Sequence, residues 1–158
     1  MVELVIVLAI AAILTTLAAP SFRSMIQNNR ATTQANDVLA TLNLARSEAI
    51  RRGIRVSLCA SADQATCSGS ADWATGWIVF TDDGATPGVK DATETLLQVH
   101  ESLSGAAQLD QTAGGTNVQF LASGQSQAVT QFDLCTGDQA RTIDTERSGR
   151  SAVSTSAC

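Results

Sequence analysis

An unbroken apolar run opens the chain. Residues 4–19 read LVIVLAIAAILTTLAA and contain no charged side chain. Counted from Met1, the segment is about long enough to cross a bilayer as a helix. We therefore predict that residues 1–20 form a hydrophobic helical segment that inserts in a membrane.

Two features bear on the role of this run. Leu17-Ala18-Ala19 resembles the cleavage site of a secretory signal peptide, but no Lys or Arg precedes the run and Glu3 stands at its start. A carboxylate inside a membrane is costly, which makes Glu3 a candidate functional residue. The alternative is that Glu3 lies in the headgroup region, where the helix dipole favours it.

The pattern becomes amphipathic between Pro20 and Gly53. Pro20 interrupts the helical pattern and predicts a kink. Gly53 suits the residue that follows a helix, so we expect one long helix to about residue 52, with its half at 21–53 packed on a head. Apolar residues at spacings of three and four predict a single stripe for that contact: Phe22, Met25, Ile26, Ala35, Val38, Leu39, Leu42, Ala45 and Ala49.

Short strands are indicated after Gly53, where apolar residues alternate or form brief runs. Turn signals such as Asp82-Asp83-Gly84 and Pro87-Gly88 separate them. Many strands after one long helix predict an α+β fold, in which residues 54–158 form a β-rich globular head. The expected strands lie at 55–59, 77–80, 96–100, 118–121, 131–135, 141–144 and 152–153.

Charge narrows the function classes. The chain has a net charge of −5, and the five basic and three acidic residues up to Gly53 give that part +2, which leaves −7 for the head. An acidic head argues against a general nucleic-acid coat protein, which needs a basic surface. A mildly basic stalk before an acidic head is the arrangement expected if the head leaves the cytoplasm.

Four cysteines form an even set, which in an exported domain indicates disulfides. Of the three connectivities that four cysteines allow, we favour Cys59–Cys67 and Cys135–Cys158, because each closes a short or terminal loop. The alternative is a zinc site. The sequence offers it no CxxC pair and only one histidine, His100.

Other candidate chemistry is sparse. His100 has no Ser, Cys or Asp motif around it, and no catalytic or phosphate-binding motif occurs, so we expect neither an enzyme nor a cofactor. Asp82-Asp83-Gly84 with Asp91 offers oxygen ligands for calcium. Asp-Gly between strands is far more often only a turn.

Several segments resemble a known family. Glu3 and the apolar run after it resemble the start of type IV pilins and type II secretion pseudopilins from their third mature position onward. The head resembles the GspH/FimT family, which includes the pilus minor pilins FimU and FimT and a secretion pseudopilin. The matching head segments are 45–53, 56–59, Trp73 and 76–82.

The resemblance implies a type IV pilin-like fold and a role as a minor pilin in the inner membrane and then in a type IV pilus, in a tip or priming complex. It implies that Glu3 pairs with the N-terminal amine of a neighbouring subunit and sets register. The expected partners are other minor pilins, the major pilin and the inner-membrane assembly platform. Prepilin peptidase would process the precursor, and we expect the leader and processing site to lie outside this sequence.

Two alternatives follow from the same resemblance. Some FimT proteins take up DNA through a Gly-Arg-x-Arg tail. Here Gly149-Arg150-Ser151-Ala152 matches its first half, and Ala152 replaces the second arginine. The candidate DNA contacts are Arg141, Arg147 and Arg150, and contacts to so few phosphates would weaken steeply with salt. The other alternative is a type II secretion pseudopilin, although the paired cysteines suit the pilus members better.

Overall fold

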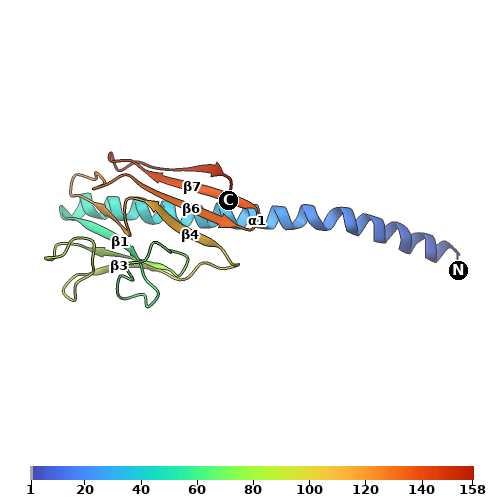
Figure 1. Ribbon diagram of the computed structural model, residues 1–158, viewed down its shortest axis with the longest axis horizontal. Helices are drawn as coiled ribbons and strands as arrows, with labels where there is room; N and C mark the ends of the chain where they lie inside the picture. The colour runs from blue at the N-terminus through green and yellow to red at the C-terminus, as the bar shows by residue number, and fades with distance from the viewer. Residues whose placement is uncertain (1) are drawn as a thin grey trace.

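The computed structural model describes residues 2–158, with the side chains of all of them except residues 11–21. Within that range the chain forms one long helix, α1 (Val2–Arg52), followed by eight strands. Figure 1 shows the N-terminal part of α1 projecting away from a β-rich head that packs on its C-terminal part. The expected α+β fold, with a long N-terminal helix packed on antiparallel sheets, is confirmed.

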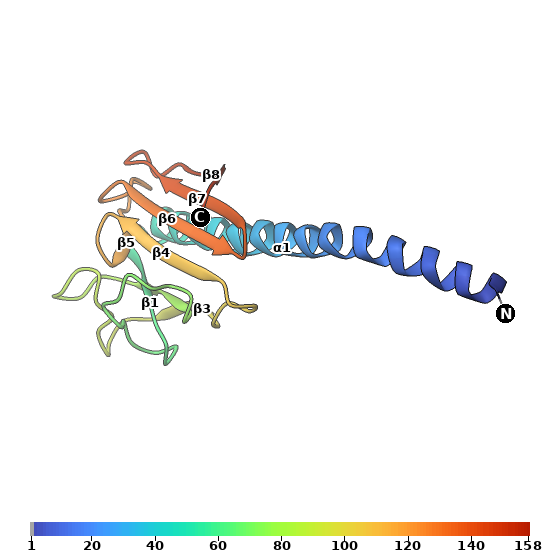
Figure 2. The ribbon, with the colours of Figure 1, turned by 45° about the vertical axis from the view of Figure 1, so that its right-hand side comes forward.

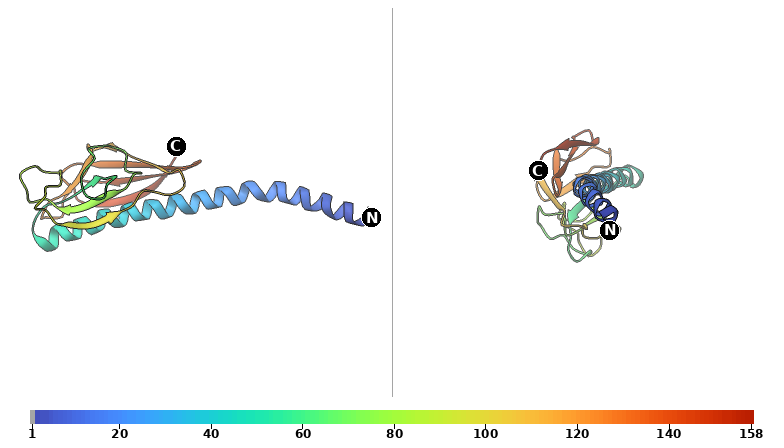
Figure 3. Two further views of the ribbon diagram at one scale, coloured as in Figure 1. Left: turned by 90° about the horizontal axis from the view of Figure 1, so that it is seen from below. Right: turned by 90° about the vertical axis from the view of Figure 1, so that its right-hand side faces the viewer.

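The strands of the head divide between two four-stranded antiparallel sheets, which the sequence did not predict. The first has the order β3-β2-β1-β5 and the second the order β4-β6-β7-β8. Both sheets lie on the same flank of α1, as the left view of Figure 3 shows. Their strands are β1 (Val56–Ala60), β2 (Trp77–Thr81), β3 (Leu96–His100), β4 (Gln108–Ala113), β5 (Asn117–Phe120), β6 (Thr130–Thr136), β7 (Gln139–Thr145) and β8 (Ser151–Ser156).

A stripe of small residues on α1 meets the core of the head. Alanine predominates in this stripe, and its short side chain lets the sheets approach the helix closely. Large side chains from both sheets and from the loop before β2 fill the remaining space. Trp73 of that loop and Phe132 of β6 meet edge to face with ring centroids 4.8 Å apart. The buried residues of the helix stripe are Ala31, Ala35, Val38, Leu42, Ala45 and Ala49.

The prediction of a single apolar stripe along 22–49 is wrong. Phe22, Met25 and Ile26 are 67%, 60% and 48% exposed, whereas Ala35 is fully buried against the head. Ile26 and Ala35 lie nine residues apart, which is about two and a half turns, so their side chains point to opposite sides of α1. The spacings of three and four residues therefore assigned residues from two separate faces of the helix to a single stripe.

The helix is continuous through residue 20, and Figure 3 shows that it curves gently toward its N-terminal end. The side chain of Pro20 lies outside the described side chains, so a kink caused by this residue stays a prediction. At the other end, Gly53 has a positive φ of 67°, and its N–H donates to the carbonyl of Ala49 at 2.9 Å. This is the C′ geometry expected for Gly53.

Two disulfides connect the head. Cys59 on β1 is bonded to Cys67, with their Cα atoms 5.5 Å apart, and Cys135 on β6 is bonded to Cys158, with their Cα atoms 5.7 Å apart. The first bridge closes a surface loop. The second ties the last residue of the chain to an inner strand of the second sheet, at the C label in Figure 2.

Candidate functional site

The projecting part of α1 is an exposed apolar surface. Monomeric soluble proteins rarely expose apolar patches of this extent, which usually mark protein or membrane contacts. No helix is long and apolar enough to cross a membrane in the part of the chain whose side chains are described. The exposed fractions lie between 53% and 74% for Val2, Leu4, Val5, Ile6, Val7, Leu8 and Ile10.

Glu3 lies in the first turn of this helix. A carboxylate there is favoured by the positive end of the helix dipole. Among residues 2–158, no basic side chain lies within 4.0 Å of its carboxylate. The carboxylate of Glu3 is therefore available to a partner outside the described chain.

A groove of about 340 Å³ lies where the base of the head meets α1. Arg30, Thr33 and Asp37 of the helix form one side, and His100 with the loop after it forms the other. The His100 ring stacks on buried Trp77, with centroids 3.8 Å apart and an angle of 8° between the rings. Stacking on Trp77 holds the His100 ring in place, and most of the residues that line the groove carry polar side chains.

Asp82 is buried at the end of β2 in a network of hydrogen bonds and one ion pair. Its carboxylate lies 2.9 Å from Nε of Arg55 and accepts a hydrogen bond from Nη2 of the same side chain at 3.1 Å. It also accepts hydrogen bonds from Ser57 Oγ and, at 2.8 Å, from the N–H of Gly88. Asp82 therefore joins β1 to the loop after β2.

The three candidate calcium ligands, Asp82, Asp83 and Asp91, do not face a common site. Asp82 faces Arg55, Asp83 is exposed, and Asp91 lies beside Glu94. Glu94, which the sequence analysis did not single out, accepts hydrogen bonds from the N–H groups of Gly84 at 3.0 Å and Asp91 at 2.7 Å. The described residues contain no group of three or more acidic, His or Cys side chains placed to hold a metal ion.

The loop closed by Cys59 and Cys67 is organised by one exposed carboxylate. Asp63 accepts hydrogen bonds from Thr66 Oγ1 at 2.6 Å, from the N–H groups of Thr66 and Ala65, and from Ser61 Oγ. These hydrogen bonds lower the pKa of Asp63 well below its usual range, and the bond from the Thr66 hydroxyl has the largest effect. The ionised form of Asp63 therefore holds the loop in shape.

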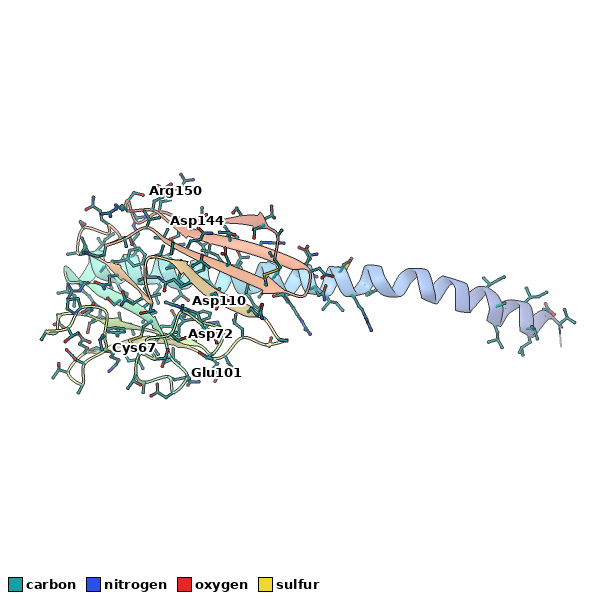
Figure 4. The ribbon with its side chains drawn as sticks, viewed as in Figure 1. Cys67, Asp72, Glu101, Asp110, Asp144 and Arg150 are labelled. Carbon is teal, nitrogen blue, oxygen red and sulfur yellow. A yellow bond between two sulfur atoms is a disulfide. The ribbon has the colours of Figure 1, made fainter. Side chains whose placement is uncertain are left out.

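The three candidate DNA-contact arginines do not form one group. Arg141, near the start of β7, donates hydrogen bonds to Asn28 and Thr32 of α1. Arg147 and Arg150 lie beyond the other end of β7, in the turn to β8, where Figure 4 labels Arg150. Both side chains are exposed, and among the described residues no carboxylate lies within 4.0 Å of either.

One helix residue, Arg46, supports this turn, which sequence reasoning did not anticipate. Arg46 donates from Nε to the carbonyl of Gly124 at 3.0 Å and from Nη2 to that of Ser148 at 3.3 Å. Gly149 has a φ of 78°, and a Cβ there would lie 2.0 Å from the carbonyl oxygen of Gly124. Only glycine fits at this position, so the Gly149-Arg150 pair has a structural cause whatever Arg150 binds.

A family model and solved structures both relate this chain to pilin-like proteins. The family model described as type II transport protein GspH matches residues 34–149. No curated protein sequence matches the chain.

Two solved structures share the fold. The type IV minor pilin FimU of Pseudomonas aeruginosa PAO1 has 20% identity and a TM-score of 0.64, and the match covers 82% of this chain and 92% of that one. The minor pseudopilin EpsH of the Vibrio cholerae type 2 secretion system has 16% identity and a TM-score of 0.56, with 80% and 97% covered.

Proposed function

Because the chain belongs to the GspH family of pilin-like proteins, we propose that it is a minor pilin that assembles into a type IV pilus, in a tip or priming complex. The observation that carries the proposal is the exposed apolar part of α1, which extends well beyond the head. In water this surface is unfavourable, so it requires a lipid or protein environment.

The proposed mechanism uses the same surface twice. Residues 1–20 hold the subunit in the inner membrane as a single span, with the head, residues 54–158, on the periplasmic side. On extraction, these residues exchange lipid for the helices of neighbouring subunits. The half at 21–53 fixes the head to the helix, so that pulling on one moves the other.

Glu3 has the role of a register residue in this mechanism. Its carboxylate has no basic partner among the described residues, and a neighbour's N-terminal amine would neutralise it. An ion pair in an apolar filament core specifies alignment more than it adds stability. Prepilin peptidase, the assembly platform, other minor pilins and the major pilin are the partners this role requires.

The test is piliation of a strain that carries Glu3→Ala. We expect assembly to fail while the soluble head keeps both disulfides and its near-UV circular dichroism. Glu3→Gln is the matched variant, because it keeps the size of the side chain and removes only the charge. Normal piliation in both strains would exclude the register role.

A second candidate function is DNA binding during uptake. The observation in its favour is that Arg147 and Arg150 are exposed, without a carboxylate within 4.0 Å among the described residues, at the end of the head far from the N-terminus. Arg141 is separated from them by the length of β7. We expect Arg147→Ala/Arg150→Ala to abolish salt-sensitive binding of duplex DNA and Arg141→Ala to have little effect. No binding of the parent protein at low salt would exclude this function.

A role in type II secretion is the third candidate. Deletion of the gene separates it from the pilus role, because the loss of secreted enzymes with normal piliation would assign the chain to a secretion pseudopilus. Loss of piliation with normal secretion would support the proposed function.

A further inference from the structure

One face of α1 runs from exposed apolar residues, beginning at Phe22, to the groove beside the head. We call it the outer face, and it consists of Phe22, Ile26, Arg30, Thr33 and Asp37. Steps of three, four and seven residues place these positions on one side of a helix. Its N-terminal part is apolar and exposed, and its C-terminal part is polar and charged.

The charged part of the outer face is not neutralised within the described chain. No carboxylate there lies within 4.0 Å of the Arg30 guanidinium. Asp37 has only His100 nearby, with Nε2 at 4.0 Å from its carboxylate, and its side chain is 46% exposed. The positive charge of Arg30 and the negative charge of Asp37 therefore lie seven residues apart, about 10.5 Å along the helix axis.

The groove beside these charges is a built feature. The side-chain amide of Gln34 is buried and donates to the carbonyl of Ser104 at 2.9 Å, and its oxygen accepts from Thr136 Oγ1 at 3.1 Å. These bonds fix the loop after β3 and the end of β6 to α1. Gly105 in the same loop leaves room for Arg30, because a Cβ there would lie 2.7 Å from its Nη1.

We propose that the outer face is the docking site for a parallel helix of a different pilin subunit. That helix carries an acidic residue opposite Arg30 and a basic residue seven positions later, opposite Asp37, with apolar residues before them to cover Phe22 and Ile26. The inference rests on the proposed assembly function and adds to it the chemistry of the neighbour.

A second copy of this chain lacks that pattern. Seven positions after Glu3 and Asp37 the helix has Ile10 and Leu44, and α1 ends before the residue seven positions after Glu48. An antiparallel copy would pair Arg30 with Asp37 reciprocally. It would also place Phe22 opposite residue 45, whose side chain is buried against its own head, and so would leave the apolar part of the outer face uncovered.

The test uses the full chain in a non-ionic detergent and two labelled helical peptides. Both peptides have an apolar N-terminal half. One carries Glu followed seven positions later by Lys, and the other carries Lys followed by Glu. Binding is measured by fluorescence anisotropy at low salt, with Arg30→Asp/Asp37→Arg as the matched variant, whose folding is checked by tryptophan fluorescence.

We expect the Glu-then-Lys peptide to bind the parent at least about fivefold more tightly than its counterpart, as two matched ion pairs against two mismatched ones predict. The variant should reverse this preference. Equal binding of the two peptides, or no binding of either, would overturn the inference. Self-association of the full chain that Arg30→Asp alone abolishes would also overturn it, because the double variant keeps the reciprocal pairing of an antiparallel copy.

These outcomes are separable from failure of the proposed function. If the peptides do not discriminate while Glu3→Ala blocks piliation, only the docking site is wrong. Normal piliation in a strain that lacks the gene would instead remove the assembly function on which the docking site rests.

Discussion

Replacing Asp82 with alanine should destabilise the head by about 3–5 kcal/mol, because it breaks a buried ion pair and leaves the guanidinium uncompensated. The Asp82 side chain is fully buried, and it accepts from Arg55, Ser57 and the N–H of Gly88. The Arg55 side chain is 26% exposed, so water partly solvates its charge after the substitution. We therefore expect a value near the lower end of the range.

The assay is urea unfolding of the full chain in detergent, followed by tryptophan fluorescence. Trp73 and Trp77 are both 1% exposed, so their emission reports loss of the core shared by the helix and the head. A lower midpoint with an unchanged slope would show lost stability in a cooperative transition. Asp83→Ala is the matched control, since Asp83 is the exposed neighbour and its loss should change stability by no more than about 0.5 kcal/mol.

A loss of stability below about 1 kcal/mol for Asp82→Ala would refute the reasoning, because it would be close to the loss caused by an ordinary surface substitution. A second variant separates the charge from the packing. Arg55→Met/Asp82→Leu replaces both charged groups by apolar ones, which should restore the part of the stability lost to the uncompensated charge but not the part lost by the Ser57 and Gly88 donors. Calcium that raises the urea midpoint of the parent and not of Asp82→Ala would assign the carboxylate to a metal instead.

Three further predictions concern the head. Gly149→Ala should cost at least about 1–3 kcal/mol, measured by urea unfolding, because φ is positive and a Cβ would strike a backbone oxygen. Since folding depresses the pKa of Asp63, its ionised form stabilises the head above the unfolded pKa, about 3.9, and this stabilisation is lost as pH falls below that value. Asp63→Asn should therefore lose less stability than the parent between pH 5 and pH 2. Removing Cys135–Cys158 should cost about 3.4 kcal/mol and Cys59–Cys67 about 2.5 kcal/mol, from sequence separations of 23 and 8.

The sequence predicted the elements whose local pattern and burial agree. The long helix and the strand at Trp77–Thr81 are of this kind, because every residue of that strand is buried and apolar or β-branched. It missed β4, whose inward positions hold Leu109 and the polar Gln111. The Nε2 of buried Gln111 donates to the carbonyls of Ala113 and Asn117, which are two and six residues away but reach the side chain only through the turn between β4 and β5.

The candidate sites were limited in the same way. Residue type and the resemblance to a tail motif identified Arg141, Arg147 and Arg150 but gave no information on their separation, which depends on the direction of β7. The partner of Asp82 is Arg55, 27 residues away, so nothing local in Asp82-Asp83-Gly84 indicated an ion pair. Periodicity likewise gave the apolar positions of α1, but only the placement of the head divided them between two faces.

The attachment of both sheets along one flank of α1 determines how the head would respond to mechanical force. A pull on the N-terminal end of the helix acts along the contact between the helix and the sheets, from Ala31 to Ala49. This is loading in shear, in which the contacts along that length resist together instead of opening one after another. The bridge from Cys158 to β6 holds the segment after β8 against the second sheet under the same load.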